Sequence, residues 1–299
     1  MISITILSER EIVEWNAIMP MIETALQEDL PWGDVTSEHL ISPLQTSTFV
    51  LILKQEGVLA GIPVAEKIFQ RLDSHIGWTA AHQDGEKLSK GTILAEITGT
   101  SQVLLQAERV ALNFLQRLSG IATLTSHFVE EAKKGSDHVR LVDTRKTTPG
   151  LRYLEKYAVR MGGGSNHRFN LSDAVMIKDN HLAILSQSSR PLKEAVAELR
   201  GKIPHTMRIE IEIDTLDQLE AVLEAGAEII LLDNMSCEMM RRAVEKTQGR
   251  ALLEASGGVT LETVREIAAT GVDIISVGAL THSAPAIDIS LDLSKSNGP

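Results

Sequence analysis

One structural unit repeats along the chain from about residue 138 onward, and it constrains the fold more than any other feature. Each unit begins with a short β-branched, apolar run that ends in polar residues, and a helical pattern follows it. Two helical segments, TLDQLEAVLEAGA and TLETVREIAATG, end at a glycine placed as a C-cap. The runs cover residues 139–146, 174–180, 207–214, 227–234, 251–258 and 272–279. Strict alternation of strand and helix predicts a parallel sheet, either a closed barrel or an open doubly wound sheet.

The barrel is the favoured form, because six units follow one another without a Rossmann-type glycine turn after the first strand. The first half of the chain has a different pattern. Residues 48–61 and 92–99 alternate apolar and polar side chains as strands do, and a helix is predicted at 62–72 between them. A long helical pattern then begins at Leu104 and leads into the repeating units.

The change of pattern predicts two domains. An α+β domain is expected over residues 1–116 and a β/α barrel over residues 117–284. The tail, 285–299, contains the alternating stretch AIDISLDL, which is predicted to be a strand that returns to the first domain. A chain of 299 residues has room for two domains of ordinary size.

Composition excludes several classes of protein. The formal net charge is -11, which argues against a protein that coats nucleic acid with a basic face. A single cysteine, Cys237, excludes a disulfide framework and suits a reducing compartment. The N-terminus lacks the basic segment of a signal peptide, and no apolar run approaches the ~20 residues of a membrane helix. We therefore expect a cytoplasmic enzyme that binds neither nucleic acid nor membrane.

One segment departs sharply from the acidic character of the chain. Between Val139 and Lys178, eight cationic side chains accompany three acids, so this window carries +5 and the remainder -16. The window includes three consecutive glycines in MGGGSNHR, which would let the backbone approach an anion closely. The alternatives are a solvated surface cluster and a flexible linker. A local basic cluster on an acidic body favours a pocket for a small anion.

The polar residues that end the predicted strands show where chemistry is expected. Active sites gather at the carboxyl ends of strands in β/α barrels, and open sheets bind ligands there too. The strand-end residues are Arg145, Lys146, Lys178, Glu212, Asp233, Ser256 and Gly278. Arginine offers a planar fork to a carboxylate or phosphate, and lysine offers a point charge. Lys178 fits an anion contact and a Schiff-base nucleophile equally well on pattern alone.

Acids and glycines complete the predicted site. Glu212 and Asp233 end successive strands and could hold Mg2+ directly or through water, although Glu210 and Asp214 share the parity of Glu212. The SGG stretch at 256–258, ahead of a helix expected near Thr260, is typical of a phosphate cradle. From the residues alone, we predict a small polyanionic ligand with at least one phosphate and Mg2+ beside it.

Several ordered motifs together resemble one family. They include EDLPWGDVTS, AERVALNFLQRLSGIAT, DTRKTTPGLRYLEKYAV, GGGSNHRFNLSDAVMIKDNH, EIEIDTLDQL, IILLDNMS, EASGGVTLETV and GVDIISVGALTHS. Across nearly its full length the chain resembles quinolinate phosphoribosyltransferase, also called carboxylating nicotinate-nucleotide pyrophosphorylase. This resemblance implies a pentosyltransferase of NAD biosynthesis that makes nicotinate mononucleotide, pyrophosphate and CO2 from quinolinate and phosphoribosyl pyrophosphate. It also implies Mg2+, at least a homodimer, and an open-faced α/β sandwich followed by an incomplete, six- or seven-stranded barrel.

The resemblance assigns roles to individual positions. It places Arg145, Lys146, His167, Arg168 and Lys178 in the quinolinate and pyrophosphate pocket, and Arg109 in the neighbouring subunit's site. Glu212 and Asp233 fall on the acidic positions near the ribose and the metal. The expected catalytic groups are Lys146, Lys178, Glu212 and Asp233. The expected substrate contacts are Arg109, Thr144, Arg145, Lys146, His167, Arg168, Lys178, Glu212, Asp233, Ser256, Gly257, Gly258 and Gly278.

Three other functions remain as alternatives. A paralogue of the same fold from the molybdenum-transport neighbourhood would keep the phosphoribosyl chemistry and change the acceptor, but the intact SNHR and MIKDNH stretches favour quinolinate. A Schiff-base aldolase would use Lys178 as its nucleophile. A phosphometabolite sensor would bind phosphoribosyl pyrophosphate without turnover.

Overall fold

The computed structural model describes residues 14–188 and 190–294, which fall into two compact units. The first contains the described residues as far as Ser126, together with Thr147–Gly163 and the chain from Leu280 onward. The second contains His127–Lys146 and Gly164–Ala279. The division falls within the long helix α4 (Ser101–Lys133). Three segments of sequence therefore build the first unit.

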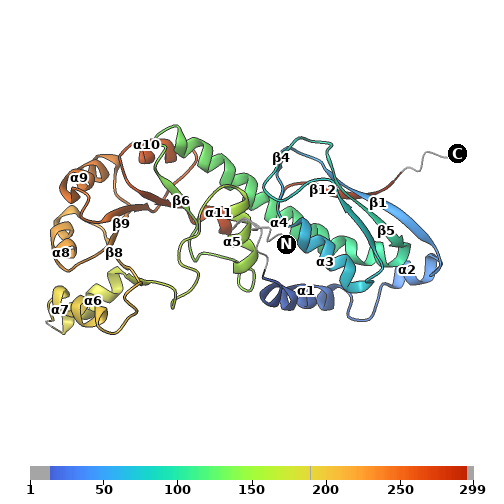
Figure 1. The fold of residues 1–299 in the computed structure, drawn as a ribbon, viewed down its shortest axis with the longest axis horizontal. Helices are drawn as coiled ribbons and strands as arrows, with labels where there is room; N and C mark the ends of the chain where they lie inside the picture. The colour runs from blue at the N-terminus through green and yellow to red at the C-terminus, as the bar shows by residue number, and fades with distance from the viewer. Residues whose placement is uncertain (1–13, 189, 295–299) are drawn as a thin grey trace, which may run out of the picture. The chain divides into compact units, whose positions relative to one another are not determined.

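A four-stranded antiparallel sheet forms the centre of the first unit, with strand order β12-β1-β5-β3 (Figure 1). The predicted strand in the tail is β12, which pairs with β1 through Leu51 and Leu291. The strands are β1 (Thr46–Leu53), β3 (Gly77–Ala80), β5 (Ile93–Thr100) and β12 (Ile289–Leu293), and a small ladder joins β2 (Gly57–Val58) to β4 (Lys87–Leu88). The helices are α1 (Trp15–Asp29), α2 (Val35–Leu40), α3 (Ile62–Leu72), the first part of α4, and α5 (Arg152–Met161).

Alternation along the strands explains how the first unit buries its core. Leu51 and Leu53 are fully buried on β1, and the apolar side of α3 is buried with Ile68 and Phe69. A buried ion pair also holds α4 to α5: Arg117 Nη2 lies 2.8 Å from an oxygen of Glu155, which is fully buried. Glu155 also accepts hydrogen bonds from Thr148 N and Oγ1, at 3.0 and 2.8 Å, so it fixes the start of the 147–163 segment.

The second unit is a parallel sheet whose strand order is β6-β11-β10-β9-β8-β7. Its strands are β6 (Arg140–Val142), β7 (Val175–Ile177), β8 (Ile209–Ile213), β9 (Ile229–Asp233), β10 (Leu252–Ser256) and β11 (Ile274–Ser276). All six predicted runs are confirmed as strands. The first strand pairs with the last, as in a barrel, whereas the first strand of a doubly wound sheet lies in its middle. Among the described residues β6 and β7 do not pair, so the barrel is incomplete, as expected.

Ser165 occupies part of the gap beside β6. It forms an isolated parallel bridge with Val142, and its amide donates to Leu141 O at 2.8 Å. This contact stands where a seventh strand would run, on the side of β6 away from β11. The segment after the three glycines is thus a strand reduced to one bridge, which explains why no apolar run marks it in the sequence.

Helices cover the outer side of the parallel strands, as Figure 1 shows for α8, α9 and α10. Side chains alternate along each strand, so Ile209, Ile211 and Ile213 of β8 share one side while Glu210 and Glu212 share the other. The helices and the 3-10 turn of this unit are α6 (Asp179–Gln187), α7 (Leu192–Arg200), η1 (Leu216–Gln218), α8 (Leu219–Glu224), α9 (Cys237–Thr247) and α10 (Val264–Ala268). The short helix α11 (Ala279–His282) begins at the last residue of this unit and otherwise belongs to the first. None of the helices within residues 14–294 that the structure describes has the length and apolarity needed to cross a bilayer.

Candidate active site

A cavity of about 580 Å3 lies within the second unit, at the carboxyl ends of its strands. It gathers most of the residues predicted from the sequence: Thr144, Arg145, Lys146, His167, Arg168, Lys178, Glu212, Asp233, Ser256, Gly257 and Gly258. These residues come from segments more than 100 positions apart, yet their side chains line one hollow. Arg145, Arg168 and Lys178 all belong to this lining, so the predicted cations converge.

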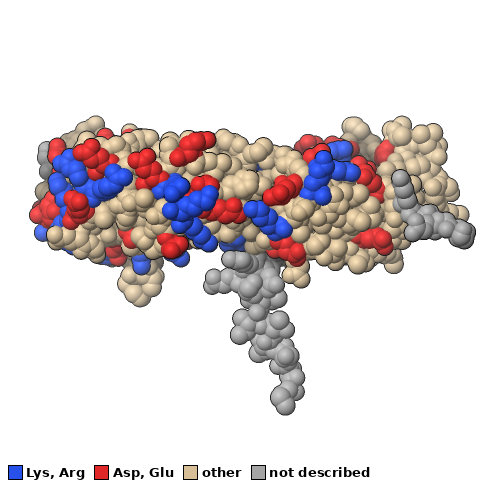
Figure 2. All heavy atoms as spheres, turned by 90° about the horizontal axis from the view of Figure 1, so that it is seen from above, with Lys and Arg blue, Asp and Glu red and all other residues tan. Residues whose placement is uncertain are grey.

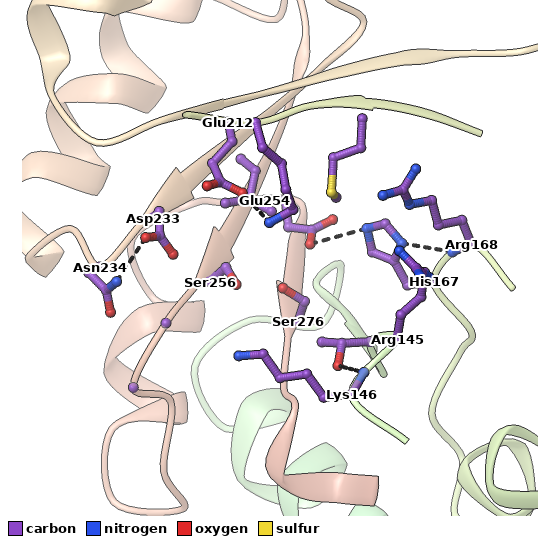
Figure 3. Close-up of a pocket in the computed structure, with 16 residues that line it drawn as sticks. Arg145, Lys146, His167, Arg168, Glu212, Asp233, Asn234, Glu254, Ser256 and Ser276 are labelled. Atoms are coloured by element: carbon purple, nitrogen blue, oxygen red, sulfur yellow. Dashed lines mark hydrogen bonds and ion pairs between the residues drawn. The ribbon is translucent and has the colours of Figure 1, made fainter. Parts of the chain in front are cut away.

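The lining has two chemically distinct sides (Figure 3). Arg145, His167 and Arg168 lie together on one side, and Glu212, Asp233 and Asn234 lie on the other. A cationic wall suits carboxylates, whereas an acidic wall suits hydroxyl groups or a cation. The arrangement can hold a molecule, or a pair of molecules, that presents carboxylate groups at one end and a sugar phosphate with a metal ion at the other.

The glycine-rich segment is held in place by a buried carboxylate. Asp143, at the end of β6, is fully buried and accepts hydrogen bonds from His167 N at 2.8 Å and Asn166 Nδ2 at 2.7 Å. Arg168 Nη1 donates to Ala174 O at 2.9 Å, which orients its guanidinium. The sequence DTRK therefore supplies an anchor for the basic segment, Asp143, one cation of the wall, Arg145, and a further cation of the cavity lining, Lys146.

His167 lies between two carboxylates from the barrel interior. Its Nε2 is 3.3 Å from Glu210 Oε2 and 3.5 Å from Glu254 Oε1. Glu210 and Glu254 are 3% and 1% exposed, and among the described residues Glu210 Oε1 has no hydrogen-bond partner. Three ligand atoms within 4.8 Å of one another could also hold a divalent ion.

Glu210 and Glu254 influence the protonation of the His167 imidazole. Burial lowers the pKa of His167, but hydrogen bonds and charge interactions with Glu210 and Glu254 outweigh it and raise the pKa to about 10. Burial, together with the charge of Glu254, raises the pKa of Glu210. The Glu210 carboxyl therefore competes with His167 for a proton. The Arg168 amide opposes protonation, because it donates to His167 Nδ1 at 2.7 Å. Charge-assisted hydrogen bonds are roughly twice as strong as neutral ones, so we expect a cationic ring near neutral pH.

The two arginines of the basic wall influence each other. Burial and the nearby charge of Arg145 lower the pKa of Arg168, although an arginine remains charged in proteins. The like charges of Arg145 and Arg168 repel each other. A bound carboxylate or phosphate would relieve this repulsion, which favours a dianion on this wall.

The phosphate loop depends on two glycines with left-handed backbone angles. Gly257 has φ +90°, and a Cβ there would lie 2.2 Å from Asn234 Oδ1; Gly258 has φ +58° and open space beside it. The expected helix start near Thr260 is not observed, because α10 begins at Val264 after a turn. The backbone of the loop, rather than a helix terminus, therefore lines the cavity.

Glu212 and Asp233 form a donor set that suits Mg2+. Both are carboxylates on the neighbouring strands β8 and β9, and Asn234 adds an amide whose Nδ2 donates to Asp233 Oδ2 at 2.8 Å. Magnesium prefers oxygen ligands and keeps several waters, so one or two carboxylates suffice. Glu212 Oε2 is 2.7 Å from Lys178 Nζ, which balances the charge of the carboxylate.

Five further residues line the cavity that sequence reasoning did not select: Met176, Leu231, Asn234, Glu254 and Ser276. Strand parity could have found four of them. Glu254 lies two residues before Ser256, Leu231 two before Asp233, Met176 two before Lys178, and Ser276 two before Gly278, so each has the parity of a predicted strand-end residue. Asn234 carried no such signal.

Two predicted residues lie outside the cavity lining. Gly278 stands between β11 and α11, two positions beyond Ser276. Arg109 belongs to the first unit, on α4, where its side chain is 60% exposed and its closest acidic oxygen, on Glu108, is 4.0 Å away. The cavity of this chain therefore forms without Arg109.

Charge on the face drawn in Figure 2 is mixed, with Lys and Arg interspersed among Asp and Glu. This face lacks the continuous basic surface that a nucleic acid would require. The cations that matter for the site are instead those that line the cavity.

Family models now connect this geometry to known proteins. The model for the N-terminal domain of quinolinate phosphoribosyl transferase matches residues 34–119, and the model for its C-terminal domain matches residues 121–292. The chain belongs to the quinolinate phosphoribosyltransferase family. The two matched regions span nearly all of the described chain.

Individual members of the quinolinate phosphoribosyltransferase family are similar over most of their length. A probable carboxylating nicotinate-nucleotide pyrophosphorylase of Bacillus subtilis is 43% identical over 270 residues, covering 90% of this chain and 91% of the relative. A decarboxylating quinolinate phosphoribosyltransferase of Nicotiana tabacum is 40% identical, covering 91% and 81%. The crystal structure of NadC from Streptococcus pyogenes has a TM-score of 0.89 at 40% identity, covering 94% and 97%. The fold expected from the resemblance is thereby confirmed.

Proposed function

We propose that this protein transfers a phosphoribosyl group from phosphoribosyl pyrophosphate to quinolinate and releases pyrophosphate and CO2, giving nicotinate mononucleotide. The observation that carries the proposal is the two-sided cavity, in which a cationic wall faces an acidic wall and a glycine loop. Family relatives named for this reaction support it. The reaction belongs to the carboxylating nicotinate-nucleotide pyrophosphorylases, which are pentosyltransferases of NAD biosynthesis. A single cysteine suits a cytoplasmic enzyme.

The cationic wall binds and orients the acceptor. Arg145, His167 and Arg168 offer charged donors for the two carboxylates of quinolinate. The strongest contacts are expected on the 3-carboxylate, which is retained. Tight binding of the 2-carboxylate would stabilise the ground state and slow its loss as CO2.

The opposite wall and the glycine loop hold the phosphoribosyl donor. Ser256, Gly257 and Gly258 line the place where the 5′-phosphate would lie, and Glu212 with Asp233 would hold Mg2+ and the ribose hydroxyls. When bound, Mg2+ would neutralise charge on the departing pyrophosphate. Lys146 and Lys178 contribute fixed positive charge to the same group.

Positioning and electrostatics are sufficient for the first step. As pyrophosphate leaves, C1′ of the ribose gains oxocarbenium character, and the pyridine nitrogen of quinolinate attacks it. The ring nitrogen is then cationic, so the electron pair of the C2–carboxylate bond is stabilised on C2 as CO2 departs. C2 finally takes up a proton. No covalent intermediate with the chain is required.

A homodimer completes the proposal, with Arg109 reaching into the cavity of the partner subunit. Three observations support this role: Arg109 is exposed, it lies outside its own cavity, and the family resemblance assigns it across the interface. An additional guanidinium would add to the cationic wall, where dianions must be bound.

One assay tests the function directly. The protein is mixed with quinolinate, phosphoribosyl pyrophosphate and Mg2+, and nicotinate mononucleotide and CO2 are measured. Formation of both in equal amounts is the expected result. Binding of phosphoribosyl pyrophosphate without any product would identify a sensor instead. Borohydride trapping of a carbonyl substrate on Lys178 would identify an aldolase, but this lysine is ion-paired with Glu212, whereas a Schiff-base lysine attacks as a neutral amine.

A further inference from the structure

The interior of the barrel contains two buried acidic side chains where a barrel ordinarily has aliphatic ones. In β/α barrels, alternate strands supply each interior layer, and bulky branched residues dominate it. Here β8 and β10, separated by β9, supply Glu210 and Glu254. Burying two carboxylates opposes folding unless they are fully partnered. Their presence therefore calls for a reason other than stability.

Both carboxylates are directed at one ring nitrogen. His167 Nε2 is 3.3 Å from Glu210 and 3.5 Å from Glu254, and the backbone of the same residue is held by Asp143. Acids from three alternate strand positions, β6, β8 and β10, thus fix a single histidine. Arg145 and Arg168 lie beside it on the same wall (Figure 3).

We propose that Glu210 and Glu254 are positioning residues that fix the orientation of the His167 imidazole on the side of the cavity that receives quinolinate. The inference rests on the proposed function and adds to it a cause for the orientation of the ring. Burial alone favours a neutral imidazole, and the two acids reverse that preference. Outer carboxylates commonly orient a histidine that contacts a metal or substrate.

Simple charge counting and the positioning role predict opposite effects on quinolinate binding when Glu210 and Glu254 are replaced. Removing negative charge from the wall of an anion site should tighten the binding of a dianion. Positioning predicts weaker binding, because His167 loses its charge and its fixed orientation together. The direction of the change therefore separates the two explanations.

Methionine is the informative replacement, since it is unbranched like glutamate but apolar. Replacing a buried, incompletely paired acid by an apolar residue of similar volume is often neutral or stabilising. Glu254→Met, Glu210→Met and the double variant should therefore keep the thermal midpoint at or above that of the parent. Glu254→Gln keeps an acceptor oxygen and is expected to show a smaller change.

The experiment measures KM for each substrate, quinolinate binding by calorimetry, and the ring nitrogens of His167 by 15N NMR. For the double variant we expect KM and Kd for quinolinate to rise about tenfold, the size of one lost charge-assisted hydrogen bond. KM for phosphoribosyl pyrophosphate should stay within about twofold, and the NMR signal should change from imidazolium to neutral imidazole. Glu212→Met, on the same side of the same strand, is the matched control and should affect phosphoribosyl pyrophosphate instead.

Four results would overturn the proposal: unchanged or tighter quinolinate binding, an equal rise of both KM values, an unaltered His167 signal, or a divalent ion bound by Glu210, Glu254 and Nε2. Inactivity of the parent protein would instead remove the proposed function. An active parent whose Met variants behave normally would remove only this inference.

Discussion

Lys178 Nζ lies 2.7 Å from Glu212 Oε2, so a cation expected to bind substrate is paired with an acid expected to bind the metal. Lys178 directly follows β7 and Glu212 lies on β8, and these strands are neighbours in the sheet. Substrate and Mg2+ would each take one partner of this pair. The ion pair thus balances the charges of the two side chains at the junction of the two walls.

Replacement of Lys178 should separate activity from stability. Lys178→Met removes a half-exposed ion pair, and such pairs contribute about 0–1 kcal/mol to the free energy of unfolding. We expect kcat/KM to fall about 100-fold or more, because a preorganised positive charge is lost from the transition state. Steady-state kinetics and thermal denaturation check both parts. Arg168→Ala should lower kcat/KM by at least about tenfold, and near-native kinetics in both variants would remove these cations from the site.

The proposed metal ligands should determine how much Mg2+ the enzyme needs for activity. Asp233→Asn retains the shape of the side chain but loses the charge that a hard cation prefers. The Mg2+ concentration for half-maximal turnover should rise at least about tenfold, the size that even outer partners of a metal ligand contribute. Quinolinate affinity, measured by calorimetry without metal, should not change. A rise in quinolinate Kd with an unaltered Mg2+ requirement would contradict the assignment.

Two inactive variants should regain activity in a mixed dimer if Arg109 acts across the subunit interface. Arg109→Ala and Arg168→Ala place their defects in different subunits of each site, so a mixed dimer contains one intact site. Co-expression should recover about a quarter of the parent activity, given random pairing. Each variant expressed alone serves as the control. Failure of recovery in mixed dimers that are shown to form would return Arg109 to an ordinary surface role.

The pH dependence of stability follows from the raised pKa of His167. Its folded value, about 10, lies above the ordinary 6.5, so protonation of the ring favours the folded state, and this contribution is complete below about pH 6.5. This contribution should decline as the pH rises from 6.5 towards 10. The free energy of unfolding, compared between the parent and His167→Gln by denaturant titration, measures it. A difference that is constant across this window would mean that the ring stays neutral, with Nδ1 accepting from Arg168.

Two adjacent glycines should respond differently to alanine. Gly257→Ala places a Cβ against Asn234 and strains a left-handed backbone, so it should cost about 1–3 kcal/mol of stability. Gly258→Ala meets open space and should cost only about 1–2 kcal/mol of backbone strain. Denaturant unfolding gives both values, and the KM for phosphoribosyl pyrophosphate should rise more in Gly257→Ala. Equal effects would show that the contact with Asn234 is unimportant.

Elements with strong periodicity were predictable from the sequence. The six parallel strands, α3, α4 and the tail strand β12 all follow from apolar patterns that reflect burial on one or both sides. The sequence pattern does not predict β3 and β4, because each strand is short and mostly exposed. It does not predict α2 and α5 either: α2 has six residues, and α5 lies inside the segment whose most conspicuous feature is its positive charge.

The sequence by itself determined the chemical types at the strand ends, because residues that follow a buried strand must lie at its carboxyl edge. Tertiary structure alone decided which of them meet. Glu210 and Glu254 are 44 positions apart, and only the strand order β10-β9-β8 directs both at His167. The physical reason is that side-chain direction is local, set by alternation along a strand, whereas proximity depends on how strands pair.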